Sequence, residues 1–260
     1  MTGALADLQL AHLQLDRRTV LVTGAGDGVG RGIALACAAR GAHIVVASPR
    51  DNGQETAQLV AERGGSADWI RCDVTVRADI EAAVALPDRI DAFVHNATSR
   101  RSSEPNLVEE ITSERWSDHA SVTLRASYYC AQAALPKLQA NGGTLILMTS
   151  PAGMEGSRML PAYGMVKGAL RGFAKSLARE WGPLGVRVNL VSPLALTPAM
   201  ENAIREDPPL ADRLAQRVPL GRLGDSETDI GAAVAFLAGP DSSYLTGQTM
   251  VIDGGRFTGL

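Results

Sequence analysis

From Thr19 onward the chain alternates between short apolar runs and longer segments with helical periodicity. Short uninterrupted apolar runs are typical of parallel strands that are buried on both faces. Strands that alternate with helices form right-handed βαβ units, so this order predicts one α/β domain with a doubly wound parallel sheet and helices on both faces. We expect strands at 19–23, 43–47, 69–71, 92–95, 144–149, 186–191 and 249–252, and helices at 29–40, 54–63, 80–86, 113–139, 163–181 and 227–237.

A glycine-rich turn joins the first expected strand to the first expected helix. Residues 23–30 read TGAGDGVG, in which Gly24, Gly28 and Gly30 give the spacing G-x-x-x-G-x-G. Glycines let the chain turn tightly and let a pyrophosphate approach the N–H groups at a helix N-terminus. A turn of this kind between a first strand and a first helix predicts a dinucleotide site.

A second pattern carries acid–base chemistry. Tyr163 stands four residues before Lys167, and Ser150 stands thirteen residues before Tyr163. Residues i and i+4 share a helix face, so the phenol and the ammonium should point into the same cleft. A neighbouring ammonium lowers the pKa of a phenol, which could then exchange a proton with a carbonyl/alcohol couple. The alternative interpretation is an exposed helix pair.

Composition excludes several other classes of function. The formal net charge of −3 argues against nucleic acid as the main partner. No apolar run reaches the ~18 residues that span a bilayer, and the N-terminus lacks the pattern of a secretion signal. The three cysteines are widely spaced, and the four histidines have no metal-ligand spacing. We therefore expect a cytoplasmic protein with no metal site and no membrane segment.

The glycine pattern and the triplet together resemble the oxidoreductase branch of the short-chain dehydrogenase/reductase family. The resemblance covers residues 15–255, nearly the whole chain. Four further segments resemble family landmarks: CDV at 72–74, HNAT at 95–98, LTGQ at 245–248 and IDGG at 252–255. The resemblance implies a Rossmann-like seven-stranded sheet, an NAD(H) or NADP(H) cofactor, and a homotetramer or dimer.

The same resemblance indicates which residues meet the cofactor. A carboxylate at the end of the second strand accepts from the ribose of NAD, whereas a base there pairs with the 2′-phosphate of NADP. Ser48 replaces the Asp of NAD-preferring relatives and Arg50 is available as a base, although Asp27 stands where a loop base is usual. We therefore expect NADP(H) to be preferred over NAD(H), with a solvated Arg50 as the alternative. The expected cofactor residues are Gly24, Asp27, Gly28, Val29, Gly30, Ser48, Arg50, Asp73, Val74, Asn96, Ala97, Tyr163, Lys167, Pro193 and Thr197.

The resemblance also implies catalytic roles. Ser150 would bond the substrate oxygen, Tyr163 would transfer the proton, and Lys167 would lower the phenol pKa and hold the nicotinamide ribose. The family has an asparagine in the preceding helix that holds a water between the lysine and solvent. Thr123 occupies that place here, so it either carries a modified relay or reduces turnover. His119, one helical turn earlier, either shares this face or is simply packed or solvated.

Substrate contacts are expected from the triplet and its neighbours. An apolar pocket would be formed by Pro151, Met154, Met159 and Leu160, together with Ser150 and Tyr163. Each of the apolar residues could equally belong to the core or to an interface. Arg100 and Arg101 could meet an anionic substrate, but a solvated loop pair is the favoured interpretation.

Three regions depart from the family pattern or lie outside it. Thr98 and Leu194 replace glycines, so the loop over the nicotinamide should be reshaped. The charged, proline-rich stretch 197–224 suggests a lid-like insertion, with a plain surface excursion as the alternative. Residues 1–14 form an arm of no assigned role, ahead of a single catalytic domain at 15–260.

The leading hypothesis is an oxidoreductase that interconverts a ketone and a secondary alcohol with NADP(H) preferred. The alternatives are an NAD-dependent alcohol dehydrogenase on the same fold and a non-catalytic dinucleotide-binding regulator. The intact triplet argues against a regulator, whereas Thr98, Thr123 and Leu194 argue for one. The expected partner is a small carbonyl or alcohol.

Overall fold

The computed structural model describes residues 14–102 and 104–258, so the predicted arm at 1–14 lies outside the described residues apart from Gln14. Seven strands form one parallel sheet in the order β3-β2-β1-β4-β5-β6-β7. The order reverses beside β1, which confirms the predicted doubly wound fold. The strands are β1 (Thr19–Thr23), β2 (His43–Ser48), β3 (Ser66–Arg71), β4 (Ala92–His95), β5 (Thr144–Met148), β6 (Arg187–Pro193) and β7 (Thr249–Ile252).

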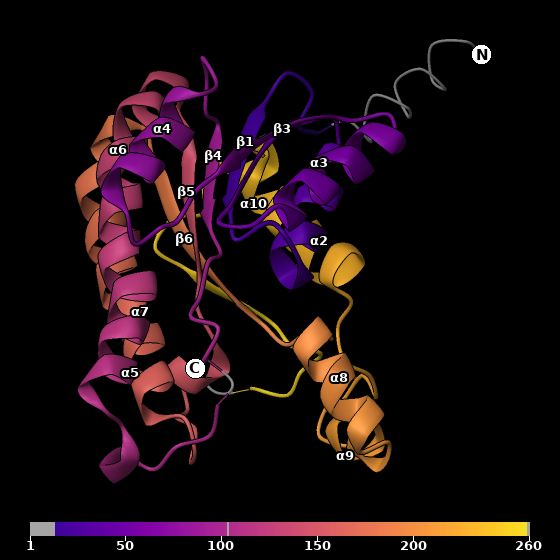
Figure 1. Cartoon of the computed structure of the whole chain (residues 1–260). Helices are drawn as coiled ribbons and strands as arrows, with labels where there is room; N and C mark the ends of the chain where they lie inside the picture. The colour runs from indigo at the N-terminus through magenta and orange to yellow at the C-terminus, as the bar shows by residue number, and fades with distance from the viewer. Residues whose placement is uncertain (1–13, 103, 259–260) are drawn as a thin grey trace.

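Two layers of helices cover the two faces of the sheet (Figure 1). One layer contains α4 (Arg77–Ala85), α5 (Ser113–His119), α6 (Ala126–Asn141) and α7 (Pro161–Trp181). The other contains α2 (Gly28–Ala38), α3 (Asn52–Glu62) and α10 (Ala232–Ala238). Alternate residues of β1 serve the two cores: Leu21 packs with the first layer, and Val20 and Val22 pack with the second.

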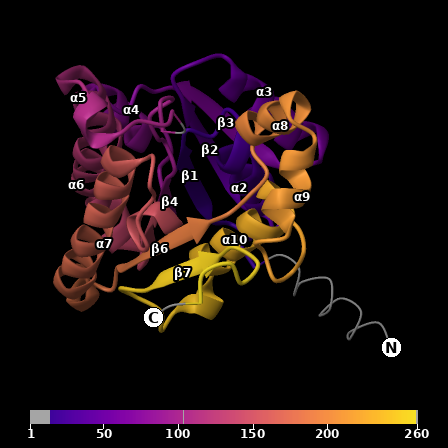
Figure 2. The same ribbon diagram turned by 90° about the horizontal axis from the view of Figure 1, so that it is seen from below.

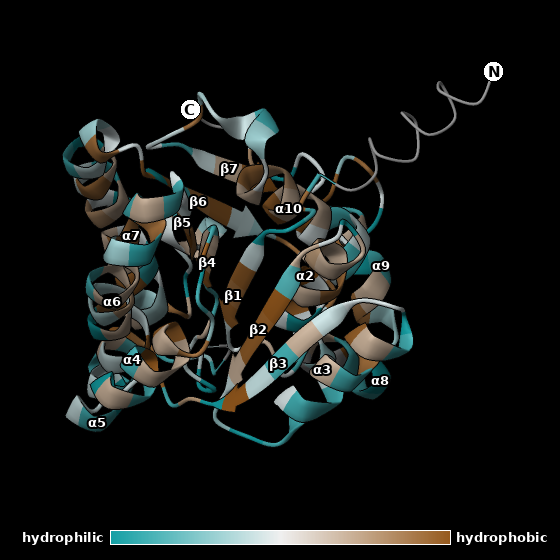
Figure 3. Cartoon of the chain, turned by 90° about the horizontal axis from the view of Figure 1, so that it is seen from above, coloured by the Kyte–Doolittle hydropathy of each residue, from teal (hydrophilic) through white to brown (hydrophobic). Residues whose placement is uncertain are grey.

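The third strand was predicted too short: β3 spans Ser66–Arg71, whereas a strand was expected only at 69–71. β3 lies at the edge of the sheet, where one face meets water, and it begins three residues before the expected run 69–71. Figure 3 shows hydrophilic colour along β3, whereas β1 and β2 are largely hydrophobic. A half-exposed edge strand lacks the continuous apolar run on which the prediction depended.

The segment predicted as one helix, 113–139, is helical throughout but changes type along its length. A π-helical segment, Ala120–Arg125, lies between α5 and α6, and α6 continues to Asn141. A second π-helical segment, Ser226–Gly231, precedes α10 where one helix was expected. At this second segment a β-carbon on Gly231 would lie 2.5 Å from the Ala36 β-carbon, so the close approach to α2 depends on glycine. Such segments are frequent at functional sites.

The stretch 197–224 contains two helices that the sequence analysis did not predict. They are α8 (Pro198–Glu206) and α9 (Pro209–Ala215), and each begins with a proline, as suits a first helical position. They lie side by side away from the sheet, at the lower right of Figure 1 and the right of Figure 2. None of the helices within the described ranges is long and apolar enough to cross a membrane.

A hydrogen-bonded clamp joins the carboxyl ends of β1 and β4. The Thr23 hydroxyl accepts from the backbone N–H groups of Asn96 (3.2 Å) and Ala97 (3.3 Å). The Asn96 side chain donates to the carbonyls of Thr23 (3.2 Å) and Gly24 (3.1 Å). A β-carbon at Gly30 would lie 2.2 Å from the Gly24 oxygen, so the clamp closes only around glycine.

The clamp also fixes the tautomer of a buried histidine. His95 Nδ1 lies 2.9 Å from the Thr23 hydroxyl. Because both N–H groups already donate to that hydroxyl, its own hydrogen points to Nδ1, and the imidazole proton resides on Nε2. Burial, assisted by the charge of Lys167, lowers the pKa of His95 to about 3, so the ring is neutral near pH 7.

The low pKa of His95 predicts a loss of stability in acid. The unfolded chain binds this proton below about pH 6.5, whereas the folded chain does not until about pH 3, so folding stability falls as the pH falls between those values. Between pH 7 and pH 4.5 the wild type should lose about 2.5 kcal/mol more unfolding free energy than His95→Asn. Urea titrations at both pH values measure this difference. His43→Asn, at a partly exposed strand end, is the control, and parallel losses in wild type and His95→Asn would refute the prediction.

Candidate active site

A cleft of about 1330 Å³ opens at the carboxyl ends of the strands. The ends of parallel strands in an open sheet are where such folds bind ligands, at the point where the strand order reverses. Every residue that the sequence assigned to the cofactor lines this cleft, as does Ser150. Thr123, Pro151 and Met154 do not line it.

The glycine turn forms a cradle at one end of the cleft. Gly24 and Gly28 have φ angles of +65° and +51°, which side-chain-bearing residues rarely adopt. Helix α2 begins at Gly28, so its free N–H groups and positive end face the cleft. A β-carbon at Gly28 would lie 3.4 Å from Pro198 at the start of α8. This cradle fits the pyrophosphate of a dinucleotide.

The stretch 197–224 borders the same cleft. Thr197, Pro198, Met200 and Asn202 contribute to its wall. The Thr197 hydroxyl accepts from the Met200 N–H at 3.3 Å and so caps the start of α8. The start of α8 thus lies beside the glycine cradle.

Arg50, the expected base of the ribose end, is paired with Asp27 of the glycine turn. The Arg50 guanidinium lies 3.2 Å from the Asp27 carboxylate, and the Asn52 amide donates to the same oxygen at 3.3 Å. Ser48 is buried, and its hydroxyl donates to the Arg50 carbonyl at 2.6 Å. Both charged side chains are about half exposed (51% and 55%), so the ion pair is weak and can be rearranged by a ligand.

The predicted triplet of Ser150, Tyr163 and Lys167 assembles where β5 meets α7. Ser150 follows β5 and caps a short turn, its hydroxyl accepting from the Ala152 N–H at 3.3 Å. Tyr163 and Lys167 lie one turn apart on α7, with the lysine nitrogen 5.7 Å from the centre of the phenol ring. The Lys167 ammonium donates to the Met148 carbonyl at 2.7 Å, which ties α7 to the end of β5.

Burial is the main cause of the pKa shifts of Tyr163 and Lys167. Desolvation raises the pKa of Tyr163, and a hydrogen bond with Ser150 partly offsets that rise. The lowered phenol pKa expected from Lys167 is therefore not what the structure shows. Burial also lowers the pKa of Lys167 to about 8. Near pH 7 the phenol holds its proton and the lysine is mostly charged.

Thr123 lies in the first π-helical segment and is buried. Its hydroxyl has no hydrogen-bond partner within residues 14–102 and 104–258, while its carbonyl accepts from the Ser127 hydroxyl at 2.6 Å. A buried hydroxyl without a partner contributes nothing to stability and carries a desolvation cost.

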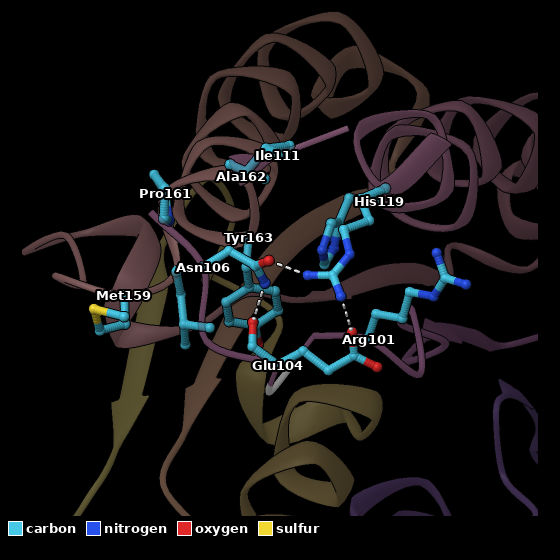
Figure 4. A pocket seen from close by; sticks show the side chains of 11 residues that line it. Arg101, Glu104, Asn106, Ile111, His119, Met159, Pro161, Ala162 and Tyr163 are labelled. Atoms are coloured by element: carbon cyan, nitrogen blue, oxygen red, sulfur yellow. Dashed lines mark hydrogen bonds and ion pairs between the residues drawn. The ribbon is translucent and has the colours of Figure 1, made fainter. Parts of the chain in front are cut away.

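A small polar cavity adjoins the triplet (Figure 4). Tyr163 and Arg101 line both this cavity and the large cleft. Met159 and Leu160 line it as expected, but Pro151 and Met154 line neither space, so their substrate role stays a prediction. The remaining walls are Glu104, Asn106, Ile111, Arg115, His119, Pro161 and Ala162.

Sequence reasoning missed several residues of this region. Glu104 and Asn106 stand in a connection without periodicity, and Arg115 looks like an ordinary surface residue of a helix. For His95 the sequence offers one signal, its place in the HNAT segment that resembles a family landmark. Throughout the part of the chain that the structure describes, no group of three His, Cys, Asp or Glu side chains could hold a metal ion.

Comparison with known proteins places this geometry among oxidoreductases. A family model described as enoyl-(acyl carrier protein) reductase matches residues 24–256. The 3-oxoacyl-(acyl-carrier-protein) reductase of Escherichia coli K12 is 34% identical, covering 94% of this chain and 99% of that protein. The 2-dehydro-3-deoxy-D-gluconate 5-dehydrogenase of Bacillus subtilis 168 is also 34% identical, covering 93% of this chain and 95% of that protein.

Solved structures give the same result. A proposed NAD(P)-dependent gluconate 5-dehydrogenase from Beutenbergia cavernae, with bound NADP, superposes with a TM-score of 0.86 at 32% identity, covering 94% of this chain and 98% of its own. A 7α-hydroxysteroid dehydrogenase complexed with NADH and 7-oxo glycochenodeoxycholic acid has a TM-score of 0.85 at 27% identity. The match covers 94% of this chain and 96% of that chain.

The unpartnered hydroxyl of Thr123 gives a test that separates function from folding. Thr123→Val keeps the shape and removes the hydroxyl, so the unfolding free energy should stay the same or rise by up to ~1 kcal/mol. If the hydroxyl relays protons, turnover should fall by at least about tenfold. Urea denaturation and steady-state kinetics measure the two effects. Ser121→Ala, in the same segment, is the control, and full turnover in Thr123→Val would exclude the relay.

Proposed function

The chain belongs to the short-chain dehydrogenase/reductase family, and on that premise we propose that it interconverts a ketone and a secondary alcohol with Tyr163 as the general acid and base. The observation that supports this most directly is that Ser150, Tyr163 and Lys167 all line the dinucleotide cleft, with the Lys167 nitrogen 5.7 Å from the centre of the phenol ring. Lys167, one turn along α7, completes the group.

The two hydroxyls would hold the substrate oxygen. In reduction, the Ser150 and Tyr163 hydroxyls donate to the carbonyl oxygen and so fix the orientation of the carbonyl. A bound nicotinamide exchanges the hydride with the carbonyl carbon. As negative charge develops on the oxygen, Tyr163 gives up its proton to it. The raised pKa of the phenol keeps that proton available at neutral pH.

Lys167 would stabilise the phenolate that remains. Its ammonium is buried beside the phenol ring, so its charge acts at low dielectric, where electrostatic effects are strong. With a pKa of about 8, the lysine is mostly charged near pH 7. In oxidation the same residues would act in reverse, and Tyr163 would take the proton of the alcohol.

The cofactor is a nicotinamide dinucleotide, and we propose NADP(H) as the preferred form. Ser48 offers no carboxylate to the ribose, and Arg50 lies beside the cleft with half of its side chain exposed. Asp27 works against this preference, because its carboxylate already neutralises Arg50 and would repel a phosphate. The same carboxylate could accept a ribose hydroxyl of NAD(H), which supports the NAD-dependent alternative.

We further propose that the protein works as a homo-oligomer, dimer or tetramer, in the cytoplasm on a small carbonyl or alcohol. Large apolar side chains on α5, α6 and α7 support this: Trp116, Tyr128 and Met165 are 36%, 47% and 56% exposed. Burying them between copies would remove apolar surface from water.

Tyr163→Phe tests the acid. The substitution removes only the phenol hydroxyl, so turnover should fall by at least about a thousandfold while cofactor affinity changes less than about threefold. A panel of ketones with NADPH and NADH, followed by cofactor absorbance, measures turnover; fluorescence titration measures binding. Tyr128→Phe on α6 is the control. A wild type with no hydride transfer to any ketone would instead support a non-catalytic regulator.

Arg50 and Asp27 test the cofactor preference. Arg50→Gln should raise the Kd for NADPH about tenfold, the effect of one lost charge pair of about 1.4 kcal/mol, and leave NADH binding nearly unchanged. Asp27→Asn should lower the Kd for NADPH, because it frees Arg50 and removes a repulsive charge. Arg77→Gln, which breaks a similarly exposed pair on α4, is the control. Tighter NADH than NADPH binding in the wild type would overturn the preference.

A further inference from the structure

The cavity beside Tyr163 has the size of a single polar group. Its volume is about 10 Å³, close to the space that one water-sized sphere occupies. Tyr163 lines both this cavity and the cleft. A substrate whose carbonyl lies at the Tyr163 hydroxyl could therefore place one nearby substituent in the cavity, and only a small one.

His119 is the wall residue with spare hydrogen-bonding capacity. Its side chain is 7% exposed, and its Nδ1 has no hydrogen-bond partner in the described part of the chain. The imidazole lies 6.4 Å from the Tyr163 ring, centre to centre. Burial lowers the pKa of His119, so the ring is neutral near pH 7 and offers one donor and one acceptor.

The other polar walls are occupied with one another. Arg115 hydrogen-bonds the Asn106 side chain and lies 3.2 Å from the Glu104 carboxylate. The Asn106 amide donates to the Glu104 carbonyl at 2.7 Å, and its backbone N–H donates to the Met159 carbonyl at 2.8 Å. Figure 4 shows this network beside Tyr163. It fixes the cavity wall and leaves recognition to His119.

The charges around the cavity balance. Arg115 is paired with Glu104, and Arg101 is paired with Glu114 at 3.3 Å. With His119 neutral, these four side chains carry no net formal charge. A carboxylate placed here would find no uncompensated cation, whereas a hydroxyl could both donate and accept without a charge being buried. The cavity therefore favours a neutral hydroxyl.

We propose that the substrate is a hydroxylated ketone, with a hydroxyl within two carbons of the reacting carbonyl, and that His119 recognises this hydroxyl. The corresponding alcohol is a diol. The inference rests on the proposed ketone reduction and deepens it by naming the substrate class. His119 is a specificity residue in this proposal, because its contact is with the substituent and not with the reacting carbonyl.

Matched pairs of ketones test the proposal. 1-Hydroxy-2-butanone and 3-pentanone differ only by a hydroxyl in place of a methyl group, as do 2-hydroxycyclohexanone and 2-methylcyclohexanone. The wild type should favour the hydroxylated member of at least one pair by about tenfold or more in kcat/KM, since a site built to bond a hydroxyl discriminates strongly against its absence. Equal kcat/KM within both pairs would overturn the inference and leave the proposed function intact.

Variants of His119 assign the preference to this residue. His119→Phe keeps an aromatic ring without nitrogens and should reduce the preference to about twofold or less, mainly by raising KM for the hydroxyketone. His119→Gln restores a donor and an acceptor and should recover part of the preference, which a purely structural role would not produce. Thermal unfolding of each variant checks folding, and His43→Phe is the matched control.

Two further outcomes would contradict the proposal. A preference that survives in a folded His119→Phe would remove His119 from recognition. Better turnover of 2-oxobutanoate, which has a carboxylate in the position of the hydroxymethyl group, than of 1-hydroxy-2-butanone would indicate an anionic substrate. Failure of every ketone with both cofactors would overturn the proposed function itself, which separates that result from a loss of preference alone.

Discussion

The clamp between β1 and β4 is the constraint on which both halves of the site depend. The Thr23 hydroxyl accepts hydrogen bonds from the two backbone N–H groups that follow the neighbouring strand β4, and it donates its own hydrogen to His95. The Asn96 amide returns to the Gly24 carbonyl at the start of the glycine turn. The floor of the dinucleotide cleft and the cradle for its phosphates are therefore one hydrogen-bonded unit, and their spacing is set before any ligand binds.

Helix α7, which carries Tyr163 and Lys167, is attached to the sheet by two hydrogen bonds. Lys167 donates to the Met148 carbonyl, and the Thr149 hydroxyl donates to the Lys167 carbonyl at 2.8 Å. Both bonds join α7 to the end of β5, immediately before Ser150. The ammonium thus has two functions: it satisfies a strand carbonyl and supplies charge beside the phenol. Burial makes that charge costly, which is why the pKa of Lys167 falls, and also makes it effective.

The periodicity of apolar residues and the positions of the strand ends were enough to predict the sheet and the place of the cleft. Alternating apolar and amphipathic segments predicted the sheet, and because parallel strands end at one edge, the residues assigned to the cofactor all reach one cleft. Contacts between side chains that are far apart in the sequence could not be predicted in this way. The sequence indicates that Arg50 would bind a phosphate and that Asp27 would repel one, but in the structure the two side chains form an ion pair with each other. Glu104 and Asn106 lie in a connection without periodicity, so no pattern indicated that they wall a cavity beside Tyr163.

One helical stretch brings two buried polar side chains to α7, the helix that carries Tyr163 and Lys167. His119 ends α5, and Thr123 lies in the π-helical segment that follows; both segments contact α7. The His119 ring lies 6.4 Å from the Tyr163 ring, centre to centre, and its Nδ1 has no hydrogen-bond partner in the described part of the chain. The Thr123 hydroxyl is also buried without a partner among the described residues. Two unpartnered polar groups on one stretch, both next to the helix of the phenol, carry a desolvation cost that a purely structural segment would not need.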